Sequence, residues 1–450
     1  MRLGRLSIGL AAAISLLAEP SYHRDIRPIL QKNCAGCHQP SSKASGLDLT
    51  TFAAFRSGGS RGGAFVAGQP SESLIVKYLT GVMKPVMPMG ASPLPPEQIA
   101  TIREWITAGA RDDTPAAESV ISSQPTVYHQ PPVITALRFS PDGKTMAVSG
   151  NREVLLHNAD GSGLIRRMQG RAERILSVAF STDGSLMVAG GGTPARFGEV
   201  QWWDPRSGKE LRSAEVTTDT VFGASLAPDA SRVVVGATDN TVRILDSKTA
   251  KELHKVGSHE NWVLATVFGV DGKRFVSVGR DRAAKLMDTN QGQFLENVNA
   301  LKTELGAVAR HPQQDVVVIG GEDRYPYVYM MDRPRNLKVG DDATLIRRLE
   351  RQDGPIFALD WSSDGKRIAV AGAAPNVILY DADTGNRLSA CSGHSAGIYT
   401  VSFSPDGAHL ATGGFDGTVR IYSAANCTLE KSFIPVPVVP GGGTATGGGQ

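Results

Sequence analysis

Phe403-Ser404-Pro405-Asp406-Gly407 is one of seven short segments in which an expected strand ends in a tight turn. Most copies keep an aromatic residue first and Asp-Gly last. The other six are Phe139-Ser140-Pro141-Asp142-Gly143, Phe180-Ser181-Thr182-Asp183-Gly184, Leu226-Ala227-Pro228-Asp229-Ala230, Phe268-Gly269-Val270-Asp271-Gly272, Arg310-His311-Pro312-Gln313 and Trp361-Ser362-Ser363-Asp364-Gly365. Successive copies start 41 to 51 residues apart. Short strands with a period near 40 to 45 residues indicate a propeller.

The remainder of each copy agrees with this interpretation. Gly-rich strand ends such as Val188-Ala189-Gly190-Gly191 precede strands that close on an aromatic or apolar residue and Asp, as in Trp202-Trp203-Asp204. Two copies begin with a small residue and His, Ser258-His259 and Gly393-His394. This pattern resembles the WD-repeat family. We therefore expect an all-β, seven-bladed propeller over residues 126–434.

The resemblance implies structural roles for the polar and aromatic residues of the repeats. His259 with Asp281, and His394 with Asp416, should form hydrogen bonds that hold a blade together rather than a catalytic site. The tryptophans are expected in the core rather than at a ligand: Trp202, Trp203 and Trp361.

Two insertions interrupt the regular period. Gly191–Gly198 is expected to form a loop on the top rim, and Arg333–Ala343 to lie between two outer strands on the opposite face. Insertions in repeat arrays often mark binding surfaces. Tolerated length variation explains them equally well, and both interpretations stay open.

The N-terminal part of the chain contains Cys34-Ala35-Gly36-Cys37-His38, the C-x-x-C-H pattern of covalent c-type haem attachment. Two thiols one helical turn apart can reach the two vinyl groups of one porphyrin, and the adjacent His can meet the iron. C-x-x-C alone also occurs in zinc knuckles and redox dithiols. The following His, and the absence of a second Cys pair in the sequence nearby, disfavour both alternatives.

Helices are expected on either side of this motif, over residues 22–34 and 95–108. A Met-rich loop, Met83 to Gly90, precedes the second helix, where a thioether ligand to the iron would belong. Met87 is the first candidate, with Met89 and Met83 behind it. Alternatively, these residues only cover the porphyrin edge as flexible hydrophobic side chains. His23 is a further, weaker ligand candidate.

Residues 19–112 resemble the planctomycete-type cytochrome c domain. The resemblance rests on Asp25 to Leu30, the haem motif, Gly68 to Ser73, Met87-Pro88, and the segments 94–99 and 105–110. It implies a small all-α domain with one covalent haem c, held by Cys34 and Cys37, with His38 as proximal and Met87 as distal iron ligand. The family commonly has a second Pro where this chain has Met89, which leaves the choice between Met87 and Met89 open.

Composition and the remaining segments limit the possible functions. A net charge of +3 gives no basic field for nucleic acid. Residues 1–18 have the layout of a secretory signal peptide, after whose cleavage no membrane span is expected, and an uncleaved anchor stays open as the alternative. Residues 113–125 are expected to be a linker and residues 435–450 a disordered tail. Cys391 and Cys427 are expected at opposite ends of neighbouring blades, beyond the ~7 Å Cα separation that a disulfide tolerates.

These observations favour an exported, periplasmic haem protein that transfers single electrons, with the propeller docking a redox partner or complex. The repeats show no catalytic triad, metal cluster or second haem motif, so we expect an electron-transfer protein rather than an enzyme. Two alternatives stay open. One is a propeller-based oxidoreductase that uses the haem as its electron outlet, and the other is a haem sensor or peroxidase with an open sixth iron position.

Overall fold

The computed structural model of the chain describes residues 19–34, 37–38, 44–90, 92–114, 126–333 and 343–439. It divides into two compact units, Met1–Ser119 and Val120–Gln450. The expected signal segment 1–18 lies outside the described residues, as do positions 115–125 of the linker and 440–450 of the tail. The finer domain boundaries therefore stay predictions.

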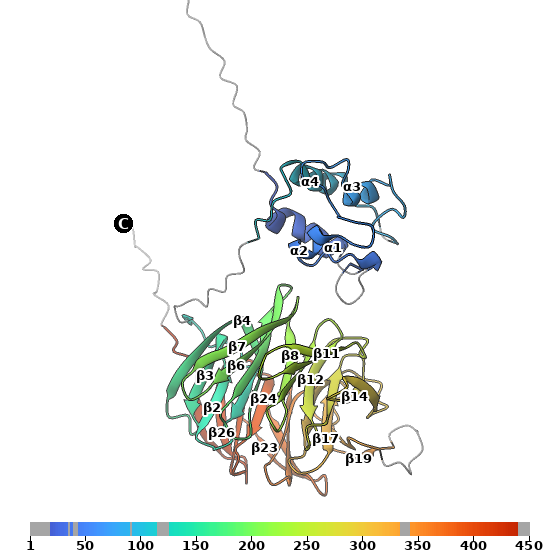
Figure 1. Cartoon of the computed structure of the whole chain (residues 1–450). Coiled ribbons are helices and arrows are strands. Elements are labelled where there is room, and N and C mark those ends of the chain that lie inside the picture. The colour runs from blue at the N-terminus through green and yellow to red at the C-terminus, as the bar shows by residue number, and fades with distance from the viewer. Residues whose placement is uncertain are drawn as a thin grey trace, which may run out of the picture. The chain divides into compact units, whose positions relative to one another are not determined.

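The N-terminal unit is helical (Figure 1). Its elements are η1 (Tyr22–Ile26), α1 (Arg27–Asn33), η2 (Ala44–Gly46), α2 (Phe52–Ser57), α3 (Leu74–Leu79) and α4 (Pro96–Thr107). Pro28 lies in the first turn of α1, directly after η1, and has no N–H to bond to that preceding turn. Pro95 likewise occupies the cap position of α4. Both helices thus match the ranges that the sequence predicts.

The first and last helical segments build the core of this unit. Tyr22 and Leu30 from the first segment, and Ile102 and Trp105 from α4, are almost completely buried. The ring centroids of Tyr22 and Trp105 lie 5.6 Å apart. Burying each side chain of this size contributes about 1.5–3 kcal/mol, so this contact fixes how the two ends of the unit pack.

The described part of the C-terminal unit is all-β and contains six antiparallel sheets, several of which are labelled in Figure 1. Its first sheet has seven strands in sequence order: β1 (Leu137–Phe139), β2 (Thr145–Ser149), β3 (Asn151–Asn158), β4 (Leu164–Phe180), β5 (Met187–Thr193), β6 (Phe197–Asp204) and β7 (Lys209–Thr217). β4 pairs with β3 through its first part and with β5 through its second part. One long strand therefore joins the first two sequence copies into a single sheet.

The other five sheets each have four strands in sequence order. The second sheet contains β8 (Val221–Leu226), β9 (Arg232–Ala237), β10 (Val242–Asp246) and β11 (Glu252–Val256). The third contains β12 (Val263–Phe268), β13 (Arg274–Gly279), β14 (Ala284–Asp288) and β15 (Gln293–Asn297). The fourth contains β16 (Leu305–Arg310), β17 (Val316–Gly321), β18 (Tyr327–Met330) and β19 (Leu345–Arg348).

The last two sheets complete the unit. They contain β20 (Ile356–Trp361), β21 (Arg367–Gly372), β22 (Val377–Asp381) and β23 (Arg387–Cys391), and then β24 (Ile398–Phe403), β25 (His409–Gly414), β26 (Val419–Ser423) and β27 (Leu429–Phe433). The all-β class is thus confirmed, whereas the strands form six separate sheets instead of seven.

The repeated turn explains why each copy ends its strand where it does. In the first copy the Ser140 N–H donates to the Thr145 carbonyl, and the Ser140 hydroxyl donates to Asp142 Oδ1 at 2.6 Å. Asp142 also accepts the Lys144 N–H, and Gly143 adopts a φ of +68° that favours glycine. This local hydrogen bonding ends one strand and starts the next.

Seven strands end at the first residue of a sequence copy, namely β1, β4, β8, β12, β16, β20 and β24. Residues from all seven line one cavity of about 190 Å³. The strands that follow in the four-stranded sheets, β9, β13, β17, β21 and β25, are buried along nearly their whole length. Such strands need a neighbouring sheet on each face.

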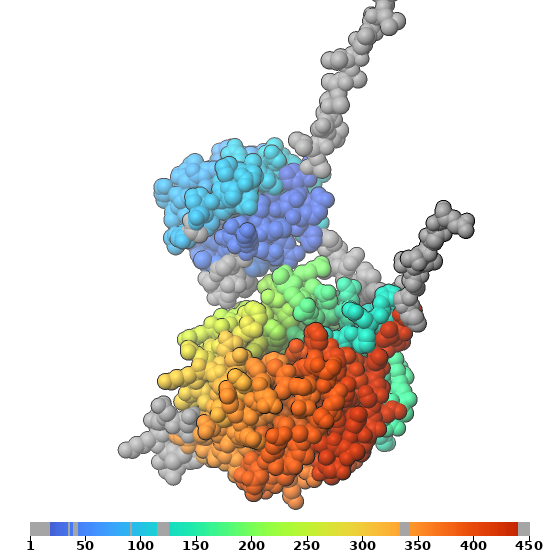
Figure 2. All heavy atoms as spheres, turned by 180° about the vertical axis from the view of Figure 1, so that it is seen from behind, coloured from blue at the N-terminus to red at the C-terminus, as the bar shows by residue number. Residues whose placement is uncertain are grey.

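The first and last sheets of the β unit meet directly. The Leu137 N–H donates to Thr400 Oγ1 at 3.0 Å. Further out, Tyr128 forms a parallel bridge with Val438, and the Val439 N–H donates to the Tyr128 carbonyl at 2.8 Å. Figure 2 shows the last residues of the unit, in red, beside its first residues, in teal. Ends that are distant in sequence are therefore held together.

The predicted His–Asp pairs are confirmed as buried structural contacts. His259 Nδ1 lies 2.9 Å from Asp281 Oδ1, and His259 Nε2 lies 2.7 Å from Ser277 Oγ. His394 makes the equivalent contacts with Asp416 and Thr412. The order of groups resembles a Ser-His-Asp triad, but Ser277 is fully buried, so no substrate can reach its hydroxyl. The predicted core tryptophans Trp202, Trp203 and Trp361 are buried as well.

The structure differs from the prediction for the first of the two insertions. Most of Gly191–Gly198 belongs to the hairpin of β5 and β6 instead of a loop, and the Arg171 guanidinium carbon lies 5.3 Å from the Phe197 ring centroid. Arg333–Ala343 connects β18 to β19, the two outer strands of their sheet, in the sequence, and its expected place on the opposite face stays a prediction. Residues 334–342 of that insertion lie outside the described residues.

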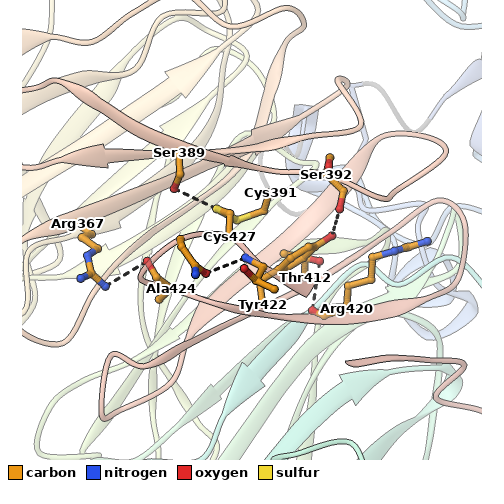
Figure 3. The surroundings of a disulfide bond; sticks show 11 residues. Arg367, Ser389, Cys391, Ser392, Thr412, Arg420, Tyr422, Ala424 and Cys427 are labelled. Carbon is orange, nitrogen blue, oxygen red and sulfur yellow. Dashed lines mark hydrogen bonds between the residues drawn. A yellow bond between two sulfur atoms is a disulfide. The ribbon is translucent and has the colours of Figure 1, made fainter. Parts of the chain in front are cut away.

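The prediction that Cys391 and Cys427 stay apart is wrong. The two residues form a disulfide, with their Cα atoms 4.6 Å apart (Figure 3). The bond joins the end of β23 to the turn before β27, in the next sheet. Ser389 lies beside it, with its Oγ 3.2 Å from Cys427 Sγ.

The reason is a contact that recurs between neighbouring sheets. The same contact occurs one sheet earlier, where Gly385 lies in the turn before β23 and Leu349 follows β19 of the neighbouring sheet. A Cβ placed on Gly385 would lie 3.2 Å from Leu349 Cδ2, so the turn and the end of the outer strand are in close contact. Cys427 adopts a similar positive φ of +60° in the turn before β27. Because strands twist, the outer strand of one sheet reaches the turn of the next, and an argument from strand ends alone misses this.

We expect the double variant C391A/C427A to unfold at lower urea concentration. Closing a loop whose ends are 36 residues apart stabilises a protein by ~4 kcal/mol in the chain-entropy account. Urea unfolding of the β unit, followed by circular dichroism, measures the loss. A reductant should lower the urea midpoint of the wild type and leave the urea midpoint of the double variant unchanged. Equal midpoints for the two oxidised proteins would contradict the prediction.

The β unit should also lose stability as the pH falls. Burial lowers the pKa of His157, His311 and His394. Below the unfolded pKa of ~6.5 the unfolded chain binds more protons than the folded one. The contribution of these histidines to the free energy of unfolding is therefore fully present above that pH. It is lost as the pH falls towards the lower pKa values that they have in the folded state. Urea unfolding between pH 7.5 and 5 measures this trend, which H394Q should weaken. Constant or rising stability on acidification would contradict it.

Candidate cofactor site

The two cysteines and the histidine of the N-terminal motif follow directly from α1. The Cys34 N–H donates to the Leu30 carbonyl at 2.9 Å, so the helical hydrogen bonding continues past Asn33. The Cys37 and His38 N–H groups then both donate to the Cys34 carbonyl, at 3.2 and 3.0 Å. Local backbone bonds thus hold the three residues in one turn.

A backbone carbonyl orients the His38 ring. His38 Nδ1 lies 3.1 Å from the Ala44 carbonyl oxygen. A carbonyl can only accept, so this contact favours the tautomer with the proton on Nδ1 and leaves the Nε2 lone pair available to a metal. The Leu49 N–H also donates to the His38 carbonyl at 2.9 Å. The two bonds therefore hold His38 at its ring and at its backbone carbonyl.

The motif lines a cavity of about 400 Å³ in the N-terminal unit. Cys34, Cys37 and His38 lie on its wall together with Met87 and Met89. Most of the other wall residues are apolar, among them Leu47, Leu49, Phe55, Ala64, Leu74, Ile75 and Leu79. The cavity therefore offers an apolar interior with nitrogen and sulfur donors.

The Met-rich loop brings two of its three candidates to this cavity. Met87 is half-buried and packs against the core, and its N–H donates to the Tyr78 carbonyl at 3.2 Å. The Met89 side chain is 72% exposed. Met83 does not line the cavity. Met87 is thus the better held of the two thioethers.

His23, the weaker ligand candidate, does not line the cavity. Its N–H donates to Asp113 Oδ1 at 2.9 Å, near the end of the unit. The structure therefore brings Cys34, Cys37, His38, Met87 and Met89 together and leaves His23 apart.

Burial raises the pKa of the Cys34 thiol to about 11. A thiol with this pKa is protonated at neutral pH, whereas a redox dithiol needs a readily formed thiolate. The environment of Cys34 thus disfavours the redox-dithiol alternative.

Sequence reasoning missed two residues that line the cavity, Arg61 and Tyr78. Arg61 is enclosed by the glycine pairs Gly58-Gly59 and Gly62-Gly63. These flanking glycine pairs could have indicated that Arg61 lies in a special turn, because paired glycines often mark a tight turn or a close backbone approach. Tyr78 carries no comparable signal.

Comparisons with known proteins agree with this division of the chain. Residues 34–89 match the family described as Planctomycete cytochrome C, and residues 385–423 match the WD domain, G-beta repeat. The chain thus carries a planctomycete cytochrome c segment followed by WD repeats. Cytochrome c domains bind haem, and WD repeats generally mediate protein–protein contacts. Together they suggest a redox-related protein with an interaction scaffold.

Several curated proteins resemble the chain. An uncharacterised WD repeat-containing protein of Schizosaccharomyces pombe is 27% identical over 251 residues, which cover 46% of this chain and 41% of that protein. The transcription factor unc-37 of Caenorhabditis elegans is 26% identical over 202 residues, 44% of this chain and 31% of that protein. Protein tipD of Dictyostelium discoideum is 21% identical over 279 residues, 60% and 43% respectively. The chain thus spans less than half the length of these relatives.

The observed cavity fits a haem. Its interior is apolar, as a porphyrin face requires, and its wall holds a histidine with an oriented ring and two thioethers.

Within the described ranges no helix is long and apolar enough to cross a membrane.

Proposed function

We propose that this protein is an exported, single-haem electron-transfer protein whose β unit docks a redox partner. The observation that supports this most directly is the shared wall of one apolar cavity, where Cys34, Cys37 and His38 lie together with Met87. Thiols, an imidazole and a thioether around an apolar space form the donor set of a closed c-type haem.

Each residue has a distinct proposed role. Cys34 and Cys37 would hold the group covalently through thioether bonds, and His38 would bind the iron through Nε2. Met87 would supply a second iron ligand through its sulfur, and its burial supports it over the exposed Met89. A bound haem supplies a one-electron iron couple. The apolar wall keeps water from the site, and the Met87 thioether favours the reduced state.

The β unit is proposed to be a seven-bladed propeller. The seven strands that line its central cavity, and the contacts between its first and last sheets, support this. The long strand β4 would then serve both as the outer strand of the first blade and as the inner strand of the second. Such a scaffold presents loops of several blades to one partner, here an unknown periplasmic redox protein or complex.

Three arguments support export. Residues 1–18 have a signal-peptide pattern, and the Cys391–Cys427 disulfide suits an oxidising compartment. Covalent c-type haem attachment in bacteria also takes place outside the cytoplasm.

We expect the reduced full-length protein not to bind carbon monoxide, because Met87 closes the sixth iron position. M87A should bind it and should have a lower reduction potential, by on the order of 0.1 V within the ~0.8 V range that axial ligands span. Absorption spectroscopy and a redox titration measure both effects. M89A is the matched control and should behave as wild type. Carbon monoxide binding by the wild type would favour a sensor or peroxidase instead.

Covalent attachment can be tested separately. The wild-type chain should keep its haem colour after denaturing electrophoresis, because both thiols form bonds to it. C34S/C37S should lose that colour on the gel. The double variant C391A/C427A is the control for loss of cysteines in general and should stay coloured. Haem that remains on C34S/C37S after denaturation would refute the assigned attachment residues.

A further inference from the structure

The charged groups of the cofactor cavity all have one sign. Among the described residues of its wall, Lys32 and Arg61 are cations, and no Asp or Glu is present. An apolar cavity whose wall carries cations but no carboxylates suits a flat apolar ligand with negative groups at its edge. Haem has this chemistry, since its macrocycle is apolar and carries two propionate carboxylates.

The backbone holds Arg61 in place. Gly59 and Gly62 exchange N–H···O bonds of 3.0 Å on either side of it, which closes a tight turn. Gly58 has a φ of +74°, and a Cβ there would lie 2.1 Å from the Gly62 carbonyl oxygen. Only glycine fits at this position, so the turn presents Arg61 in a defined place.

The Arg61 side chain is already directed to a second group of the cavity wall. Its Nη1 donates to the Tyr78 hydroxyl, and its guanidinium carbon lies 5.7 Å from the Tyr78 ring centroid. Tyr78 accepts this bond and keeps its own hydroxyl hydrogen as a donor. Guanidinium and phenol together thus offer several donors for a carboxylate.

Tyr78 also links this pair to the proposed distal ligand. Its carbonyl accepts the Met87 N–H at 3.2 Å. The residue therefore contacts Arg61 through its side chain and holds the Met87 loop through its backbone.

We propose that Arg61 and Tyr78 form a carboxylate subsite that binds a propionate of the haem. This inference rests on the proposed haem function. A guanidinium beside the propionate lowers the pKa of that carboxyl, and its positive charge favours the reduced iron. Arg61 is thus a positioning residue that also adjusts the reduction potential.

The test measures the reduction potential of the full-length, haem-loaded protein from pH 5 to pH 8. Because Arg61 is exposed, screening limits its effect. We expect R61Q to change the reduction equilibrium about five- to tenfold towards the oxidised state, roughly 40–60 mV for one electron. Its potential should also fall more steeply with rising pH, because the propionate then titrates at higher pH.

Matched variants separate this role from a structural one. R61K keeps the charge and should stay within about twofold of wild type, while Y78F should show part of the R61Q effect. R103Q removes an exposed arginine of α4 outside the cavity and should match the wild type. If R61Q loses its haem while R61K and R103Q keep theirs, the subsite is also supported.

Two results overturn the proposal in distinguishable ways. If R61Q keeps the potential and pH profile of R103Q, or if R61K shifts as far as R61Q, the subsite is wrong while the haem function stands. If the wild type itself incorporates no haem during periplasmic maturation, the proposed function fails, and the subsite fails with it.

Discussion

The second strand of each four-stranded sheet must be covered on both faces, and the β unit depends on this constraint. In β9 the central valines Val233, Val234 and Val235 have no exposed surface. Since successive side chains of a strand point to opposite faces, each such strand needs a sheet on either side. Stacking between sheets therefore buries these side chains, because pairing within a sheet leaves both of its faces open.

The N-terminal unit follows a different rule, because its cavity borders directly on its core, and Leu49, Phe55, Ala64 and Leu79 belong to both. Tyr22 and Trp105 join the first and last helical segments, while the motif, the Arg61 turn and the Met87 loop lie at the cavity. Backbone carbonyls hold parts of these segments, since the Ala44 carbonyl contacts the His38 ring and the Tyr78 carbonyl accepts the Met87 N–H.

Local features of this protein could be predicted from sequence, as could distant contacts that follow a family pattern, such as His259 with Asp281, whereas other contacts between distant segments could not. The turn at Ser140 to Thr145 is made by neighbouring residues, so its pattern located seven strand ends correctly. The haem motif was recognisable for the same reason. The Cys391–Cys427 bond depends on how one sheet leans over the next. Arg61 and Tyr78 meet across 17 residues without any periodic pattern, and their contact needed the fold.

The disulfide between the last two sheets has a consequence for the integrity of the chain. All of β24, β25 and β26 lies within the loop that Cys391 and Cys427 close. A protease that cuts one peptide bond in this loop leaves both fragments covalently linked. The final strand, and with it the segment that pairs Val438 with Tyr128, then stays tethered to the molecule. Under the proposed export, where proteases can reach the chain, nicking at this point would not release the end that holds the first and last sheets together.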